Sequence, residues 1–167
     1  MPDIITQEGE IKTDKWTLVP HPEEGEALEL PEGPVMIPAE LWLAGIDHYR
    51  GQERIGVWLE SHDEPGMLAD YVNEVPIIAV NFPKFTDGRG YSSARLLRER
   101  YGYRNELRAV GDVLLDQLQF MKRCGFDSYA LRPDKDIHLA AHCLNFFSQA
   151  YQAAGDTDLP LFRRRAS

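Results

Sequence analysis

The stretch "VPIIAVNFPKFTDGRGYSSARLLRERYGYRNELRAVG", residues 75–111, decides the fold class of this chain. Its apolar run at 75–82 predicts a buried strand, and residues 92–101 follow a helical pattern. The segment "ELRAVG" at 106–111 predicts a second strand. A strand, a helix and a strand in such a short span indicate two parallel strands joined by a right-handed crossover.

The chain upstream of this stretch predicts another strand and another helix. "RIGVWLES" at 54–61 has the composition of a buried strand. "HDEPGMLADYVNE" at 62–74 predicts a short helix, with Asp63 as its N-cap and Pro65 in its first turn. These residues therefore form a second unit of the same kind.

The same alternation continues downstream. Residues 113–123 predict a helix that is capped by Asp112, and "DSYALR" at 127–132 predicts a strand. Residues 134–152 then predict a long amphipathic helix. Strands and helices therefore alternate to the end of this segment.

Four strands alternating with four helices predict an α/β fold with a mainly parallel sheet, built from about four βα units. The sheet is either open and doubly wound or a partial barrel. Gly102 and Gly125 each follow a basic helix end, where a left-handed C-terminal glycine is expected. Short extended pieces before residue 50 predict a β-rich N-terminal segment, with Trp16 and Trp42 as packing anchors. We expect one domain, with an N-terminal segment (1–50), a βα-repeat core (54–153) and a tail (156–167).

The composition excludes several classes of protein. The net charge of -9 argues against nucleic acid, which calls for a basic face. No apolar run approaches the roughly 18 residues that a membrane span needs, and the acidic start lacks the features of a secretory signal. We therefore expect a cytoplasmic protein. Cys124 and Cys143 form no CxxC pair, so iron–sulfur binding and a redox pair are not expected, and each cysteine is interpreted as a small buried side chain.

Polar residues follow the predicted strands, and in parallel α/β folds ligands bind at the carboxyl ends of the strands. We interpret His62 and Asp112 as acid–base candidates. The candidates for binding an anion or a partner are Asp87, Gly88, Arg89, Gly90, Ser92 and Arg132.

The arginine between two glycines is the most distinctive of these features. The glycines would let the backbone turn sharply and expose N–H groups at a helix start. Arg89 supplies a planar fork that suits an oxyanion or a carboxylate. The alternative is that Asp87 and Arg89 bond each other or the backbone and only fix the turn.

Two further motifs are weak. "GRGYSS" at 88–93 is a near miss to the dinucleotide fingerprint, because Ser93 replaces the third glycine and the preceding loop is long. His138 and His142 share one helix face but have no convincing third ligand, which favours a solvated polar face over a metal site. We therefore expect neither a cofactor nor a metal.

"FPKFTDGRGYSSARLLRERYGYRNELRAVGDVLLDQLQFMKRCGFDSYALR", residues 82–132, resembles a bacterial family of unknown function that is commonly encoded beside assimilatory sulfite reductase. "DKW" at 14–16 and "LPEGPVMIPAELW" at 30–42 extend the resemblance over most of the chain. Members of this family are often labelled oxidoreductases of sulfite reduction. The resemblance implies a role in sulfur assimilation, with sulfite reductase as the partner, and it carries no established catalytic residues.

Three functions follow as hypotheses. The first is an accessory protein that supports sulfite reductase without a redox centre of its own, with the loop around Asp87 and Arg89 and the tail Leu161–Arg165 as contact sites. The second is a small enzyme or binding protein acting on an oxyanion such as sulfite. The third is the cofactor-dependent oxidoreductase of the family label. Whether the protein is an enzyme is left open.

Overall fold

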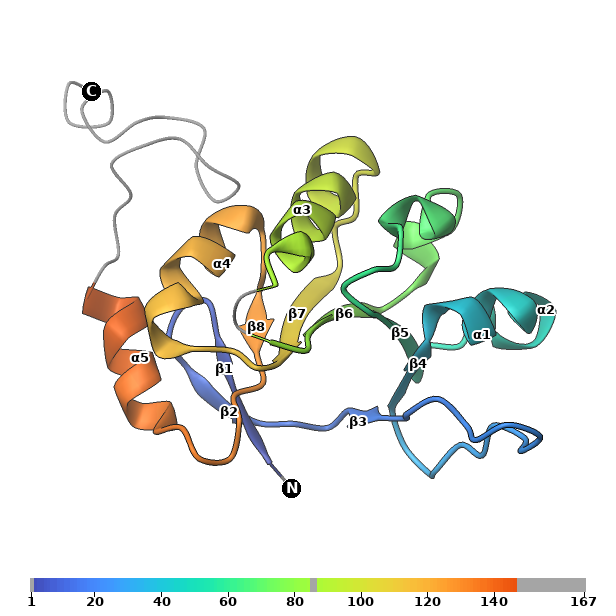
Figure 1. The fold of residues 1–167 in the computed structure, drawn as a ribbon, viewed down its shortest axis with the longest axis horizontal. Coiled ribbons are helices and arrows are strands. Elements are labelled where there is room, and N and C mark those ends of the chain that lie inside the picture. Colours follow the sequence, from blue (N-terminus) through green and yellow to red (C-terminus); the bar gives the residue numbers. More distant parts are fainter. Residues whose placement is uncertain (1, 85–86, 147–167) are drawn as a thin grey trace.

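The computed structural model describes residues 2–84 and 87–146, and in these residues eight strands form one sheet (Figure 1). The strand order is β2-β1-β8-β7-β6-β5-β4-β3. The strands are β1 (Asp3–Thr6), β2 (Ile11–Thr13), β3 (Thr17–Leu18), β4 (Val35–Pro38), β5 (Ile55–Leu59), β6 (Ile77–Phe82), β7 (Glu106–Gly111) and β8 (Ser128–Tyr129).

The sheet is mixed, which corrects the prediction of a mainly parallel sheet. Strands β3 to β8 lie side by side in chain order and pair in parallel. Strand β1 pairs antiparallel with both β2 and β8. The reason is local, since a tight connection with Gly9 at φ +83° folds β2 back on β1 as a hairpin, and only antiparallel strands can be joined so closely.

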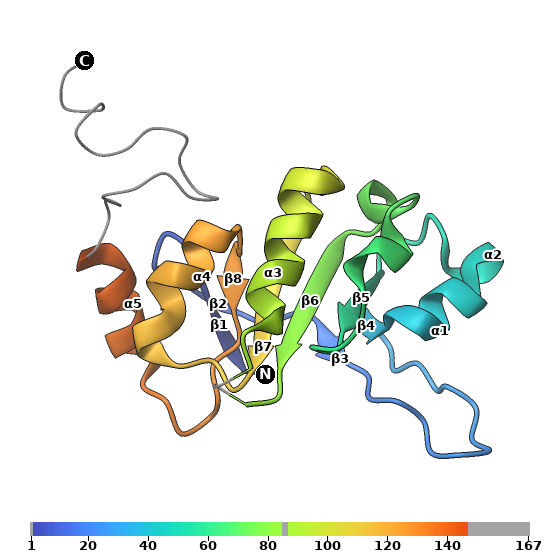
Figure 2. The ribbon, with the colours of Figure 1, turned by 45° about the horizontal axis from the view of Figure 1, so that its top comes forward.

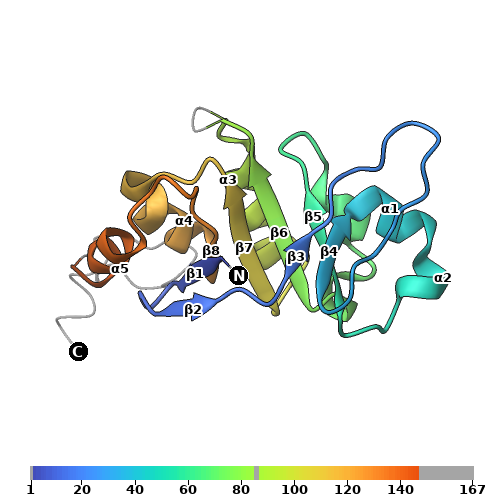
Figure 3. The same cartoon turned by 90° about the horizontal axis from the view of Figure 1, so that it is seen from below.

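The helices pack on one face of this sheet, and the sheet curls away from them into a half-barrel (Figures 2 and 3). A doubly wound sheet would carry helices on both faces and would reverse its strand order. Of the two predicted alternatives, the open doubly wound sheet and the partial barrel, the structure is therefore the partial barrel. The helices are α1 (Ala39–Ala44), α2 (Ile46–Tyr49), α3 (Arg89–Arg95), α4 (Leu118–Cys124) and α5 (Ile137–Phe146).

Alternation along the strands divides the core into two parts. In β6, Ile78 and Val80 face the helices and belong to the large core. Ile77 and Ala79 point to the opposite, concave face and belong to a smaller cluster. The other members of the smaller cluster are Met36, Trp58 and Val110, with Trp16 packed against them.

The smaller cluster is covered by the N-terminal chain, which crosses the concave face between β2 and β3 (Figure 3). We call residues 14–19 the strap. Trp16 packs on the apolar cluster, and the Trp58 indole N–H donates to the Val19 carbonyl at 2.9 Å. Trp42 is 1% exposed in the larger core. Both predicted packing anchors are confirmed.

Several predicted elements differ in type or length. Residues 39–45, the end of a piece expected to be extended, form α1 and the residue that follows it, and α2 comes directly after them. The helix predicted at 62–74 is two short 3₁₀ turns, Pro65–Leu68 and Val72–Glu74. Asp63 does not cap a helix, because its carboxylate accepts the backbone N–H of Glu60 at 2.8 Å.

The later helices are also shifted. Helix α3 begins at Arg89 and continues as a π-helical turn, Leu96–Arg100. A 3₁₀ turn, Leu115–Gln117, precedes α4, so Asp112 is not its cap. The predicted glycines are confirmed, with Gly102 at φ +68° and Gly125 at φ +111°.

Part of the predicted C-terminal region lies outside the described residues. Of the helix predicted at 134–152, α5 covers Ile137–Phe146, and the rest and the tail Leu161–Arg165 are not described. Among residues 2–84 and 87–146, no helix has the length and apolar character to cross a membrane.

Candidate functional site

The polar residues chosen from the sequence gather at one edge of the half-barrel. Strands β5 to β8 are parallel, so the loops that follow them lie along a common edge. We call these loops the strand-end face, and it comprises residues 60–64, 83–84, 87–89, 112–116 and 130–136.

Arg89 is held by Asp87. Its Nε and Nη2 donate to the two carboxylate oxygens of Asp87 at 3.0 and 2.8 Å, and Nη2 also donates to Ser61 Oγ at 3.1 Å. The backbone N–H of Arg89 donates to Asp87 Oδ1 at 3.1 Å. The side chain of Asp87 is only 13% exposed, whereas that of Arg89 is 61% exposed. This is the arrangement of the predicted alternative, in which the two side chains bond each other and fix the turn.

These contacts change the protonation of Asp87. The hydrogen bonds from the Arg89 side chain, followed by those from the Ser61 hydroxyl and the Arg89 backbone, lower the pKa of Asp87 well below its ordinary value. Asp87 is therefore a firmly ionised carboxylate. Its negative charge lies at the start of α3, where backbone N–H groups favour an anion.

Arg132 forms a second ion-paired group at the ends of β7 and β8. Its Nη1 donates to Asp112 Oδ1 at 2.8 Å, and its Nε and Nη2 donate to Asp134 at 3.0 and 3.1 Å. The hydrogen bonds with Asp112 and then with Asp134 raise the pKa of Arg132. One guanidinium thus bridges two carboxylates that follow neighbouring strands.

The two glycines around Arg89 do not have the role expected from the sequence. Gly88 has an ordinary φ of -86°, and a Cβ added there would meet nothing within 4 Å. Gly90 lies inside α3, and a Cβ there would come within 2.6 Å of the Phe82 ring. Gly90 therefore allows close packing of helix on strand and does not shape a turn. Ser92 is exposed on α3.

The two acid–base candidates belong to different groups of side chains. His62 is 68% exposed, and its Nε2 lies 3.8 Å from Asp63 Oδ1. Asp112 is 16% exposed and is held by Arg132.

Sequence reasoning missed a third group on the same face, Glu60 with Asn81. The Asn81 amide donates to Glu60 Oε2 at 3.0 Å. A Cβ added at Gly111, which has φ +92°, would lie 2.4 Å from Asn81 Oδ1, so glycine is required there. The signal was present, because Asn81 is a polar residue inside the apolar strand "IIAVNF".

Carboxylates dominate the strand-end face. The basic side chains on it are Lys84, Arg89, Arg132 and Lys135. The carboxylates that outnumber them are Glu60, Asp63, Glu64, Asp87, Asp112, Asp116, Asp134 and Asp136. Because both arginines are already paired with aspartates, the face presents a negative surface to its surroundings.

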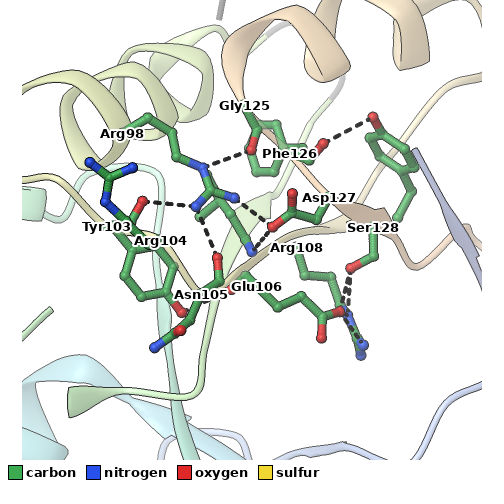
Figure 4. Close-up of polar contacts among 12 residues, drawn as sticks. Arg98, Tyr103, Arg104, Asn105, Glu106, Arg108, Gly125, Phe126, Asp127 and Ser128 are labelled. Atoms are coloured by element: carbon green, nitrogen blue, oxygen red, sulfur yellow. Dashed lines mark hydrogen bonds and ion pairs between the residues drawn. The ribbon is translucent and has the colours of Figure 1, made fainter. Parts of the chain in front are cut away.

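A different polar centre lies toward the amino-terminal ends of β7 and β8 (Figure 4). Arg98 donates to the carbonyls of Gly125, Tyr103 and Asn105 at 2.9 Å and is paired with the Asp127 carboxylate. Burial of Asp127 raises its pKa, an effect that its hydrogen bonds from Leu107 N–H and Arg98 oppose. This end of a barrel normally serves stability.

Arg108 is the second arginine of this polar centre. Its side chain lies on the concave face and is 2% exposed. Its Nη1 donates to Asp14 Oδ1 at 2.7 Å and its Nη2 to Glu106 Oε1 at 2.8 Å. Its Nε lies 3.1 Å from Ser128 Oγ (Figure 4). Because Asp14 belongs to the strap, Arg108 ties the N-terminal chain to the sheet.

No group of three His, Cys, Asp or Glu side chains that could hold a metal occurs in the part of the chain that the structure describes. His138 and His142 are both exposed on α5. Cys124 is buried, as expected, whereas Cys143 is only partly buried.

The fold and the site define an α/β half-barrel with a paired, carboxylate-rich face at the ends of its parallel strands. The profile of a family described as bacterial proteins of unknown function, DUF934, matches residues 56–162. The chain belongs to this family. No curated protein and no solved structure matches the chain.

Proposed function

We propose that this protein is a cytoplasmic accessory factor of assimilatory sulfite reduction, which supports sulfite reductase by binding it through the strand-end face. The observation that supports this proposal is that both arginines of the strand-end face are ion-paired within the chain. Arg89 and Arg132, the residues best suited to an oxyanion, are both occupied by aspartates of the chain. Carboxylates on a protein surface recognise basic side chains of a partner and speed the encounter.

The choice of sulfite reductase rests on the resemblance of residues 82–132 to proteins encoded beside that enzyme. A paired, exposed arginine is also suited to a protein interface, since arginine is enriched at interface anchors. Arg89 keeps 61% of its side chain exposed while its fork is fixed by Asp87.

The oxyanion-binding alternative has weaker support from the geometry. Asp87 Oδ1 accepts the first N–H of α3, which is the position that a bound phosphate or sulfite would take. An entering dianion would also meet Asp112 and Asp134 beside Arg132, and like charges repel. An anion would have to displace a carboxylate from each arginine before it could bind.

The test measures sulfide production by the cognate sulfite reductase with its physiological electron donor, with and without this protein. We expect a higher rate in its presence and direct binding that weakens as salt is added. Asp134→Lys reverses a charge at an exposed position of the strand-end face. This variant should lose most of the effect.

The matched control is Glu53→Lys, which makes the same change of charge at an exposed residue before β5, at the opposite end of the strand. The control should keep both binding and the rate increase. Equal losses in the two variants would mean that net charge alone is responsible. Absence of binding and of any rate change would overturn the proposal. A rise in Tm with sulfite that Arg89→Ala abolishes would instead establish the oxyanion alternative.

A further inference from the structure

A cavity of about 310 Å³ lies on the concave face between the strap and the strands β7 and β8. Most of its wall is apolar, and one buried carboxylate joins it. Its wall includes Asp14, Trp16, Leu18, Met36, Val110 and Ala130.

The cavity is adjacent to the strand-end face. Val110 lines it from β7, and Ala130 lines it from the position directly after β8. Asp112 and Arg132 follow these residues two positions later, in loops of the strand-end face, and Ala130 belongs to that face as well. The ion pair between Asp112 and Arg132 therefore stands beyond the apolar wall, at the edge of the sheet.

The rim of the cavity exposes apolar surface. Leu18 is 38% exposed on the two-residue edge strand β3, and it is one of the few large apolar side chains that are exposed in the described residues. Trp16 is only partly buried although it packs on the concave cluster. An exposed apolar rim around a cavity is typical of a binding surface.

Asp14 is the charged side chain in the wall of the cavity. Asp14 Oδ1 accepts both the Arg108 guanidinium and the Trp16 backbone N–H. The Nη2 of the same guanidinium lies 2.8 Å from Glu106 Oε1, so two carboxylates share a single positive charge. The strand-end face beyond the cavity adds the excess of carboxylates described above. An occupant with apolar and positively charged parts would complement both features.

We propose that this cavity receives one large apolar side chain from a basic segment of a partner protein, while flanking lysines or arginines of that segment bind carboxylates of the strand-end face. The cavity volume is at the small end of the range of about 300–1,000 Å³ for ligand pockets, which suits one anchor side chain. Interfaces commonly place such an anchor in a pocket and surround it with polar contacts. This inference rests on the proposed function and specifies the chemistry of the partner.

The test uses synthetic peptides as probes and carbon-13 methyl signals of Met36 and Val110 as reporters of the cavity. The peptide Lys-Lys-Phe-Lys-Lys should bind about tenfold or more tightly than Lys-Lys-Ser-Lys-Lys, since burying an aromatic side chain stabilises a complex by an amount of that order. It should also shift both methyl signals. Glu-Glu-Phe-Glu-Glu should not bind measurably.

Variants test whether the apolar anchor side chain binds at the rim of the cavity. Leu18→Ser should weaken binding of Lys-Lys-Phe-Lys-Lys several-fold and leave Lys-Lys-Ser-Lys-Lys unchanged. Leu139→Ser is the matched control, because Leu139 is equally an exposed leucine but lies on α5, which packs on the other face of the sheet. Equal affinity for the Phe and Ser peptides, unshifted methyl signals, or tight binding of the acidic peptide would each overturn the inference.

The outcome is separable from that of the proposed function. If sulfite reductase binds equally to Leu18→Ser and to the unmodified protein, the anchor pocket is refuted while the accessory role stands. If the basic peptide occupies the cavity but the reductase does not bind, the pocket stands and its partner is another basic protein.

Discussion

Replacing Arg108 by methionine is expected to lower the free energy of unfolding by about 3–5 kcal/mol. The guanidinium is 2% exposed and lies 2.7 Å from Asp14 and 2.8 Å from Glu106. Its removal leaves the Asp14 side chain, 9% exposed, with an unpaired charge that water cannot reach well. Breaking one partner of a buried ion pair costs more than the pair contributes, because desolvation of the remaining charge is not offset.

Urea unfolding followed by circular dichroism measures this effect. With a slope of about 2 kcal/mol per molar urea, a loss of about 4 kcal/mol lowers the midpoint by about 2 M. The control is Arg104→Met, in which an exposed arginine without an ion pair in the described residues is replaced, and it should change stability by less than about 0.5 kcal/mol.

A double-mutant cycle isolates the interaction with the strap. Asp14→Leu removes the other charge, so the double variant Asp14→Leu/Arg108→Met should lose clearly less than the sum of the two single losses. A loss below about 1 kcal/mol for Arg108→Met, or full additivity in the cycle, would refute the idea that this pair ties the strap to the sheet.

Three further outcomes are expected. The pKa of Asp87 is lowered in the folded state, so its stabilising effect is present above the ordinary aspartate pKa and is lost as pH falls toward the folded pKa. The difference in free energy of unfolding between wild type and Asp87→Asn should therefore be largest near neutral pH and shrink in acid. Unfolding at several pH values measures this difference. Gly111→Ala should lower Tm by several degrees, since φ is +92° and the added Cβ meets polar atoms, whereas Gly88→Ala should leave Tm unchanged or slightly raised. Tyr103→Phe should cost about 1 kcal/mol in urea unfolding, because its buried hydroxyl donates to the carbonyl of Glu106 at 2.9 Å.

The central strands and the helices α3, α4 and α5 were predictable because their signals are local. The runs predicted as strands at 54–61, 75–82 and 106–111 contain β5, β6 and β7. Each run is flanked by turn residues and is long enough to show its composition. The two left-handed glycines were equally predictable, since a helix end followed by glycine has few other backbone solutions.

The ends of the sheet were not predictable in the same way. Strand β8 was predicted, at 127–132, but it has only two residues, as does β3, so no periodicity could set the bounds of either strand. Strand β1 is defined by its pairing with β2 and β8, and the second of these partners lies more than 120 residues away in the chain. Pairing at that distance depends on the whole sheet.

The candidate site shows the same division. The positions after the strands predicted that these polar residues lie along one edge of the sheet, because the ends of parallel strands meet by geometry. From the sequence, Arg89 could bind an external oxyanion or carboxylate, or it could bond Asp87. The tertiary structure pairs it with Asp87. The bridge from Arg132 to Asp112 joins residues 20 positions apart, which no local pattern reports.

The amino-acid sequence by itself determined the alternation of strands and helices, the α/β class and the edge of the sheet at which polar residues collect. These properties follow from periodicity and from the chirality of strand crossovers, both of which act over a few residues. Only the tertiary structure decided that the sheet curls into a half-barrel, that the strap crosses its concave face and that Arg108 binds Asp14 across 94 positions. Those features depend on which distant surfaces bury one another, and burial is a property of the folded chain as a whole.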